Sequence, residues 1–211
     1  MGILNEISEN LQIGKAKIVK ELVQNALDEG VSAKDILEQG LIAGMDIVGQ
    51  KFQNNEVFVP EVLVAARAMN QGTEIIKPLL KDSGVEPIGK AVIGTVKGDL
   101  HDIGKNLVRM MLEGKGIEVI DLGVDVSADQ FYDAAVNEGA KIVCCSALLT
   151  TTMVEMRNVV DKFAAEGKRG DVVIMVGGAP VNESFKVSIG ADIYASDAAS
   201  AADAAKAALI A

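Results

Sequence analysis

Hydrophobic positions are spaced differently in two parts of the chain. Up to residue 83, apolar side chains recur at steps of three and four residues, which is the period of amphipathic helices. From residue 91 onward, short apolar runs alternate with stretches of helical period, as in parallel β-α-β units. The pattern therefore predicts a helical domain at residues 1–83, a polar and turn-rich linker at 84–90, and an α/β domain at 91–211.

Four helices are predicted in the first domain. Ser32 and Asp35 have the spacing of a capping box at the start of the third helix. Pro60 suits the first turn of the fourth helix, which Pro78 and Gly84 are expected to end. Short connections predict antiparallel neighbours, and hence a four-helix bundle. The predicted helices are Ile7–Leu11, Lys15–Glu29, Ile36–Phe52 and one from Pro60 through Leu79.

Five strands are predicted in the second domain. A parallel sheet of this size favours a flavodoxin-like or Rossmann-like fold with strand order 2-1-3-4-5, whose ligands bind where the order reverses between strands one and three. The predicted strands are Ala91–Val96, Glu118–Leu122, Lys141–Ser146, Val172–Val176 and a weak edge strand at Asp192–Tyr194. The main predicted helices are Ile103–Glu113, a helix capped by Ser127 and running through Val136, Thr151–Ala165 and Ala198–Ile210.

Composition narrows the possible partners. The 211 residues are 49% hydrophobic and lack Trp, so the chain can bury a large aliphatic core. The net charge of -10 argues against nucleic acid and anionic membranes as partners. No apolar run reaches the roughly 18 residues of a membrane span, and early acidic residues, Glu6 and Glu9, do not fit a signal peptide. We therefore expect a cytoplasmic protein.

The two cysteines, Cys144 and Cys145, are adjacent in an apolar, strand-like run. Neighbours in a strand point to opposite faces of the sheet, so these thiols are poorly placed to chelate one metal ion. We expect buried free thiols, which fit a reducing cytoplasm.

His101 is the only histidine of the chain and follows directly on the first predicted strand. By itself, it could be an ordinary surface or helix-capping histidine. Asp99 stands two residues away, and a carboxylate bound to one imidazole nitrogen leaves the other nitrogen free as a metal ligand. One histidine cannot build a closed zinc site, which needs four ligands. A metal that is already held by an organic ring needs only one axial ligand from the protein.

Three separated motifs carry a resemblance to a known family. Asp99-x-His101-x-x-Gly104, Ser146-x-Leu148 and Gly177-Gly178 stand on the first, third and fourth predicted strand ends. Together they resemble the cobalamin-binding signature of B12-dependent methyltransferases, including methionine synthase, and of carbon-skeleton mutases. In these proteins cobalamin binds in the base-off, His-on mode.

The resemblance implies a role for each matching position. His101 would be the lower axial ligand of cobalt, Asp99 would hold its other nitrogen, and Thr152 would complete a hydrogen-bonded relay. The Ser146 hydroxyl would bind the displaced nucleotide tail of the cofactor. Glycines would let that tail pass close to the backbone. The expected cofactor contacts are Gly98, Asp99, Leu100, His101, Asp102, Ile103, Gly104, Ser146, Leu148, Thr150, Gly177 and Gly178.

The helical domain resembles the cap of small corrinoid proteins. The matching motifs are Gly44-Met45-x-x-Val48-Gly49-x-x-Phe52, Glu56-x-Phe58-x-Pro60-Glu61 and Ala65-Ala66-x-Ala68-Met69. Such proteins carry methyl groups in three-component methyltransferase systems that act on methanol, methylamines, betaines or aromatic methyl ethers. Phe58 and Met69 are candidate cap contacts with the cofactor, although packing in the core explains either equally well.

The resemblance also implies a cofactor and partners. Cobalamin would alternate between methylcobalamin and cob(I)alamin, with cobalt as the reactive atom. A substrate:corrinoid methyltransferase would supply the methyl group, and a corrinoid:tetrahydrofolate or coenzyme M methyltransferase would accept it. A reductive activator protein would restore oxidised cobalt. The chain would thus be a methyl-carrying subunit that is not catalytic alone, and its linker would let the cap move.

Three alternatives remain open at this point. The small subunit of an adenosylcobalamin mutase shares the histidine motif but normally lacks the helical cap. A B12-dependent sensor or regulator has a cap, but it usually carries a DNA-binding module and a Trp and Glu-His signature. This chain has no Trp and no second His. A cofactor-free flavodoxin-like signalling domain would leave the combined motif spacing unexplained.

Overall fold

The computed structural model describes residues 2–82 and 87–211 and consists of two compact units. One unit holds Met1–Pro87 with Gly114–Gly116, and the other holds Ile88–Glu113 with Ile117–Ala211. The predicted linker at 84–90 falls partly on residues outside the described ones. Its boundaries, and with them those of the two predicted domains, therefore stay predictions.

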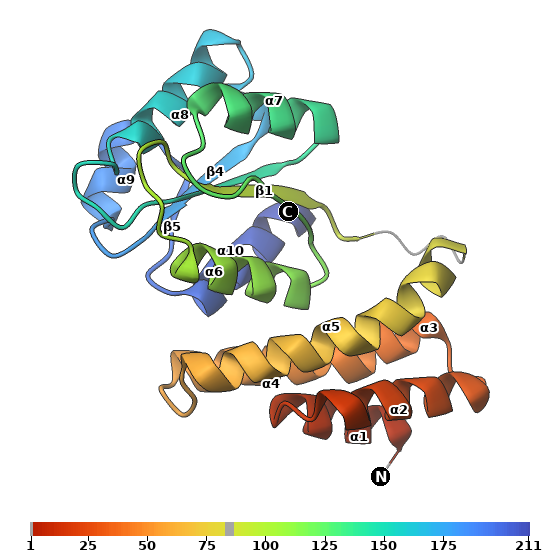
Figure 1. Ribbon diagram of the computed structural model, residues 1–211. Coiled ribbons are helices and arrows are strands. Elements are labelled where there is room, and N and C mark those ends of the chain that lie inside the picture. The colour runs from red at the N-terminus through yellow and green to blue at the C-terminus, as the bar shows by residue number, and fades with distance from the viewer. Residues whose placement is uncertain (1, 83–86) are drawn as a thin grey trace. The chain divides into compact units, whose positions relative to one another are not determined.

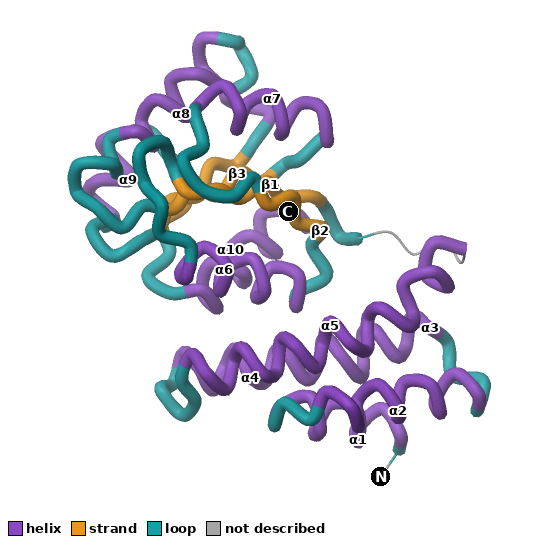
Figure 2. Tube along the Cα trace, viewed as in Figure 1, coloured by secondary structure: helices purple, strands orange, loops and turns teal. Residues whose placement is uncertain are grey.

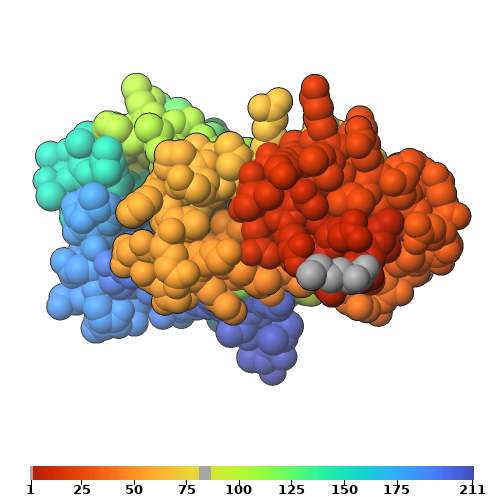
Figure 3. All heavy atoms as spheres, turned by 90° about the horizontal axis from the view of Figure 1, so that it is seen from below, coloured from red at the N-terminus to blue at the C-terminus, as the bar shows by residue number. Residues whose placement is uncertain are grey.

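The first unit is a helical bundle with an aliphatic interior (Figure 1). Ile7 and Leu11 from one helix and Val19 and Val23 from the next are fully buried, as the helical period predicts. The atoms coloured red to orange in Figure 3 belong to this bundle and form a close-packed surface. Its described helices are α1 (Ile3–Gln12), α2 (Ala16–Asp28), a continuous third helix made of α3 (Ala33–Asp35), the π-helical segment η1 (Ile36–Ile42) and α4 (Ala43–Gln53), and α5 (Val59–Asp82).

Two predicted ends of these helices are wrong. The opening helix begins at Ile3 rather than Ile7 because the carbonyl of Gly2 already accepts hydrogen bonds from the following turn. Of the two predicted stops of the fourth helix, Pro78 does not end α5, which continues to Asp82, and Gly84 lies outside the described residues. Ile76 and Leu80, on either side of Pro78, are both buried, so packing stabilises the helix beyond the hydrogen bond that proline removes.

Other details of the helical prediction are confirmed. The Ser32 side chain accepts a hydrogen bond from the N–H of Asp35 and caps the third helix. Pro60 lies in the first turn of α5. Of the two candidate cap contacts, Met69 is buried in the unit, where core packing explains it, and Phe58 is exposed.

The second unit is built on a parallel sheet in the predicted order β2-β1-β3-β4-β5. Helices α7 and α8 cover one face of the sheet, and α6 and α10 cover the other (Figure 1). The strands are β1 (Lys90–Thr95), β2 (Glu118–Asp121), β3 (Ile142–Ser146), β4 (Val173–Gly177) and β5 (Ile193–Tyr194). The helices are α6 (Ile103–Gly114), α7 (Ala128–Glu138), α8 (Glu155–Ala165), α9 (Glu183–Ile189) and α10 (Ala198–Ile210), with a short 3-10 turn, η2, at Arg169–Asp171.

Local signals place most of these elements. Ser127 forms a complete capping box with Gln130 at the start of α7, and Gly139 ends that helix in the left-handed conformation. Cys144 and Cys145 are both buried free thiols, and Cys145 belongs to the core between the sheet and α7 and α8. None of the described helices is long and apolar enough to cross a membrane.

The predicted start of the helix at Thr151 is wrong, since α8 begins at Glu155. Residues 149–154 form turns in which the carbonyl of Leu149 accepts the N–H groups of Thr152 and Met153. In this segment the N–H of Leu149 and the hydroxyl of Thr152 donate to Asp99 in the loop after β1, and such side-chain bonds compete with a regular helical start.

Candidate functional site

The three motifs meet at one edge of the sheet, where β1, β3 and β4 end side by side. Thr95 is in register with Ser146, and Ser146 with Gly177. The N–H of Val96 donates to the carbonyl of Ser146 at 3.0 Å, and the N–H of Ala147 donates to the carbonyl of Gly177 at 3.2 Å. The loops after these strands, teal in Figure 2, are therefore joined to one another by backbone hydrogen bonds.

Asp99 connects the first two motifs. Its carboxylate is fully buried, although the residues around it in the loop are exposed. Atom Oδ1 lies 2.7 Å from Nδ1 of His101 and also accepts the N–H of His101 at 3.1 Å. Atom Oδ2 accepts the N–H of Leu148 at 2.8 Å, the N–H of Leu149 at 3.3 Å and the hydroxyl of Thr152 at 2.7 Å. The predicted relay residues Asp99, His101 and Thr152 are thus in contact.

The hydrogen bonds keep this carboxylate ionised. Burial raises the pKa of Asp99, but hydrogen bonds from the Thr152 hydroxyl, the Leu148 N–H and His101 lower it by more. The resulting pKa lies well below the ordinary value. An ionised carboxylate only accepts hydrogen bonds, so Nδ1 of His101 is the protonated nitrogen and donates to Asp99. In a neutral ring, Nε2 then keeps its lone pair free for a metal or another acid.

Exposed apolar side chains lie close to His101 along the chain. The His101 side chain is 51% exposed, while Leu100 and Ile103 in the same loop are 71% and 79% exposed. Leu148 and Leu149, in the loop after β3, are also exposed. Large apolar side chains gathered at one sheet edge mark a binding surface. Here they would suit a broad, largely apolar ring with a metal at its centre.

The predicted glycines differ in how much space and which backbone conformation the structure gives them. Gly178 has φ +127°, and an added Cβ would overlap the carbonyl oxygen of Ala147. The protein's own backbone therefore requires glycine there. At Gly104 an added Cβ would meet nothing within 4 Å. At position 98 the positive φ of +79° favours glycine. An added Cβ at Gly177 would lie 3.6 Å from a carbonyl oxygen, which is an ordinary contact distance.

The remaining predicted contacts also lie at this edge. Ser146 is the partly buried last residue of β3, and Thr150 is exposed in the turn that follows. Asp102 has a local structural role, because its carboxylate accepts a hydrogen bond from the Asn106 side chain at 3.0 Å, and its carbonyl accepts the Asn106 N–H at 2.8 Å. It thereby supports the start of α6.

Sequence reasoning missed two residues that hold the histidine loop. The hydroxyl of Thr95 donates to the carbonyl of His101 at 2.8 Å. A carboxylate oxygen of Asp125 accepts the N–H of Gly98 at 2.7 Å. The only sequence signal for Asp125 was a polar residue in the turn after the second strand, and nothing in that signal indicates its partner.

A buried ion pair next to the motif was missed as well. Lys105 follows Gly104, and its side chain is only 2% exposed. Its Nζ lies 2.6 Å from both carboxylate oxygens of Asp121, at the end of β2. The pair ties the first turn of α6 to the sheet. A lysine in a helix is usually exposed, so the sequence offered no reason to expect its burial.

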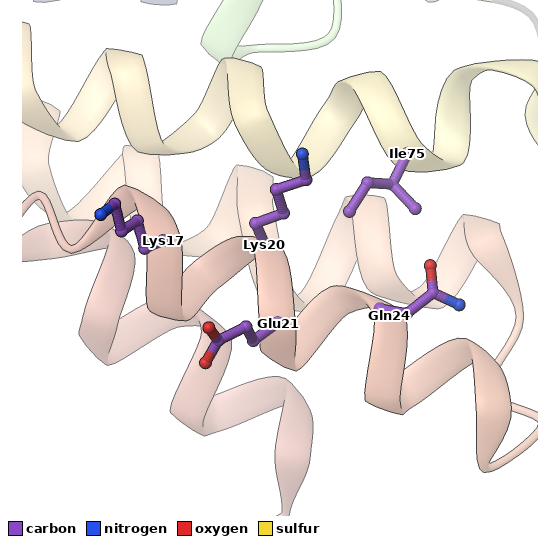
Figure 4. Close-up of a pocket in the computed structure, with 5 residues that line it drawn as sticks. All are labelled: Lys17, Lys20, Glu21, Gln24 and Ile75. Atoms are coloured by element: carbon purple, nitrogen blue, oxygen red, sulfur yellow. The ribbon is translucent and has the colours of Figure 1, made fainter.

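A surface hollow of about 420 Å³ lies on the helical unit, between α2 and α5 (Figure 4). None of the predicted site residues lines it. Its lining is mostly long polar side chains, namely Lys17, Lys20, Glu21 and Gln24, with Ile75. We assign it no function.

Known proteins resemble the chain over nearly its full length. Residues 89–206 match a family described as B12 binding domain, and residues 3–77 match a second family with the same description. The trimethylamine corrinoid protein 1 of Methanosarcina mazei is 42% identical over 196 residues, which cover 92% of this chain and 91% of the relative. A corrinoid protein of Desulfitobacterium hafniense is 38% identical over 201 residues, covering 94% and 93%.

A solved structure shows the same fold. The methanol:cobalamin methyltransferase complex of Methanosarcina barkeri contains a chain that superposes with a TM-score of 0.88 at 31% identity. The superposition covers 99% of this chain and 80% of that one.

Proposed function

Because the chain belongs to the B12-binding corrinoid proteins of methylamine and methanol methyltransferase systems, we propose that it carries methyl groups on cobalamin held by His101. One observation carries the role of His101. Its Nδ1 is bound to the buried, ionised Asp99, while its ring is half exposed among apolar side chains. This arrangement leaves one imidazole nitrogen for a metal that brings its own ring.

The residues present fit cobalamin. The chain binds this cofactor through its B12-binding domain, and we propose the base-off, His-on mode with Nε2 of His101 as the lower ligand. Bound cobalamin supplies a cobalt atom that can take up and release a methyl group. Leu100, Ile103 and Leu148 would contact the apolar parts of the ring, since all three are exposed at the same sheet edge.

Asp99 and Thr152 would manage the charge on the imidazole. Nδ1–H of His101 donates to one oxygen of Asp99, and the Thr152 hydroxyl donates to the other, each across 2.7 Å. When Nε2 bonds to a positive centre, the carboxylate stabilises the charge on the ring. The Nδ1–H proton would stay on the ring and be held by Oδ1 of Asp99.

The nucleotide tail of the cofactor would lie along the loops after β1, β3 and β4. We assign it the hydroxyls of Ser146 and Thr150 as hydrogen-bonding groups. Open space next to Gly104 supports this path, because nothing lies within 4 Å of the position of an added Cβ. The backbones of Gly98 and Asp102 complete the proposed contacts on the histidine loop. The backbones of Gly177 and Gly178 complete them on the loop after β4.

The domain boundaries and partners belong to the same proposal. Residues 1–83 would form a cap, and the linker at 84–90 would let it move aside. A substrate:corrinoid methyltransferase would load the protein, and a tetrahydrofolate or coenzyme M methyltransferase would unload it, with a reductive activator for oxidised cofactor. The trimethylamine relative makes a methylated amine the first donor class to test. A cytoplasmic location fits the free thiols of Cys144 and Cys145.

A single isotopic label tests the ligand assignment. His101 is the only histidine, so growth with 15N-histidine labels one possible protein ligand. The protein is then reconstituted with cob(II)alamin, and its electron paramagnetic resonance spectrum is recorded. A triplet splitting from a 14N ligand should become a doublet in the labelled protein. An unchanged triplet would overturn the assignment, and His101→Ala should show no effect of the label.

Methyl transfer is tested separately. The reconstituted, reduced protein is mixed with a purified trimethylamine-type methyltransferase and its amine. Appearance of the methylated cofactor spectrum supports the carrier role. Its absence with amine, methanol and aromatic methyl ether donors, each with its own methyltransferase, would contradict that role.

A further inference from the structure

We propose that Thr95 and Asp125, here called the anchor pair, position His101 as a ligand by holding the backbone of residues 98–101. This inference rests on the function proposed above. Neither residue touches the imidazole. Both bind main-chain atoms of the segment that carries it, Thr95 from the end of β1 and Asp125 from the loop after β2. They are therefore positioning residues, and Asp99 remains the group that contacts the ring.

Thr95 acts from β1. It is the last residue of that strand and is fully buried. Its Oγ1 donates to the carbonyl oxygen of His101 at 2.8 Å, so the chain returns to the strand end after forming the loop. Loss of the hydroxyl would remove the side-chain donor of this part-buried carbonyl, which is expected to cost about the free energy of one hydrogen bond.

Asp125 acts from the loop after β2. Its Oδ1 accepts the N–H of Gly98 at 2.7 Å, and its own N–H donates to the carbonyl of Asp99 at 3.0 Å. The first of these bonds joins two residues with positive φ, +56° for Asp125 and +79° for Gly98, and the second binds Asp125 to the residue after Gly98. Among residues other than glycine, asparagine and aspartate adopt the left-handed conformation most readily, and the two hydrogen bonds stabilise it at Asp125. The next residue, Val126, donates its N–H to the carbonyl of Thr95 at 2.9 Å, which fixes this loop to β1.

The anchor pair fixes the backbone of the histidine segment, which the hydrogen bond between Asp99 and His101 cannot do. Asp99 and His101 lie on the same segment, so their mutual hydrogen bond persists if the segment shifts as a whole. The bonds from Leu148, Leu149 and Thr152 tie the carboxylate of Asp99 to the loop after β3. Thr95 and Asp125 add ties to β1 and β2. A ligand that must leave and return repeatedly profits from a backbone that keeps Nε2 near one point.

The chain offers conservative and disruptive variants at both positions. Thr95→Val removes the hydroxyl and keeps the shape, whereas Thr95→Ser keeps the hydroxyl. Asp125→Gly accepts the positive φ but lacks the acceptor, whereas Asp125→Asn keeps an acceptor and tolerates that φ. Asn55, with φ +58° on the helical unit, gives the matched control Asn55→Gly.

The experiment measures the ratio of His-ligated to unligated cofactor in 15N-histidine-labelled protein reconstituted with cob(II)alamin. We expect Thr95→Val and Asp125→Gly to lower this ratio about threefold to tenfold, the effect of one lost hydrogen bond. Thr95→Ser, Asp125→Asn and Asn55→Gly should stay within about twofold of the parent protein. In cofactor-free Asp125→Gly, the nuclear magnetic resonance signal of Nδ1–H should keep its position, because Asp99 still holds that nitrogen.

The outcomes separate this inference from the proposed function. If the parent protein shows no effect of the label, the His-on assignment fails, and the role of the anchor pair fails with it. If the label splits the parent signal and Asp125→Gly keeps the parent ratio, only the anchor pair is overturned. A lost Nδ1–H signal in Asp125→Gly would also overturn it, since the variant would then act on the Asp99 contact. Should Thr95→Val not fold, the Asp125 series alone decides.

Discussion

Nδ1 of His101 lies 2.7 Å from Oδ1 of Asp99, and this bond joins a half-exposed imidazole to a fully buried carboxylate. The buried partner has its other oxygen bound to the loop after β3, so it cannot turn away without leaving several donors unpaired. The relationship therefore sets both the protonated nitrogen and the direction of the ring.

Asp99→Asn should weaken ligation by His101. Asparagine keeps an acceptor but removes the charge that stabilises a positive ring. We expect the ratio of ligated to unligated cofactor to fall at least about tenfold, as for loss of a charge-assisted hydrogen bond. The labelled resonance spectrum measures the ratio. Thr152→Ser, which keeps the hydroxyl, is the matched control, and an unchanged ratio in Asp99→Asn would contradict the role of the charge.

Two glycine variants should separate folding from cofactor binding. Gly178→Ala places a Cβ against the carbonyl of Ala147 at a positive φ and should lower the free energy of unfolding by about 2 kcal/mol or more. Gly104→Ala meets nothing within 4 Å and lies in a helix, so the cofactor-free protein should be as stable as the parent or more stable.

The affinity of Gly104→Ala for cobalamin should nevertheless fall about tenfold, because the alanine side chain would enter the path proposed for the nucleotide tail. Urea unfolding and spectrophotometric titration measure the two quantities. Normal affinity in Gly104→Ala would show that the tail does not pass there.

Asp121→Asn should destabilise the protein by breaking the ion pair with the buried Lys105. We expect a loss of about 2–3 kcal/mol, somewhat below the effect at fully buried pairs, since the Asp121 side chain is 27% exposed. Urea unfolding at pH 7 measures it. Glu38→Gln breaks the exposed pair with Lys34 and should change stability by less than about 0.5 kcal/mol.

The stability lost in Asp121→Asn should depend on pH. Burial raises the pKa of Asp121, but hydrogen bonds from Lys105 and the Gly123 N–H, together with the positive charges of Lys105 and Arg109, lower it by more, so this pKa lies below that of an ordinary aspartate. A group with a lowered folded pKa stabilises the fold above its unfolded pKa, and this stabilisation is lost as the pH falls through the folded pKa. The difference between parent and Asp121→Asn should therefore be constant near neutral pH and shrink below pH 3.8. A constant difference down to about pH 2 would be inconsistent with this pair.

The cysteines should be unreactive in the folded protein. Burial raises the pKa of Cys144 to about 12, and burial together with its neighbour raises that of Cys145 as well. An aromatic disulfide reagent at pH 8 should modify both thiols only as fast as the protein unfolds, and at once in urea. Rapid modification of the native protein would contradict their burial.

The sequence by itself determined the order of the elements and most of the local site. Alternating apolar runs and helical stretches predicted the parallel sheet, because strand burial and helix period are local properties. The 2-1-3-4-5 order came from the fold that five such strands favour, and the structure has that order. Ser127 and Gly139 marked the ends of α7 through short-range caps. The two-residue spacing of Asp99 and His101 predicted their contact, which stays within one loop.

Tertiary structure alone decided the features that join separate segments. Thr95, Asp125 and the pair of Lys105 with Asp121 act on residues that only the arrangement of β1 and β2 brings near. Likewise α5 continues past Pro78, because packing outweighs a local stop signal. A sequence pattern records how each segment faces the core, whereas hydrogen bonds between loops depend on where the folded strands place their ends.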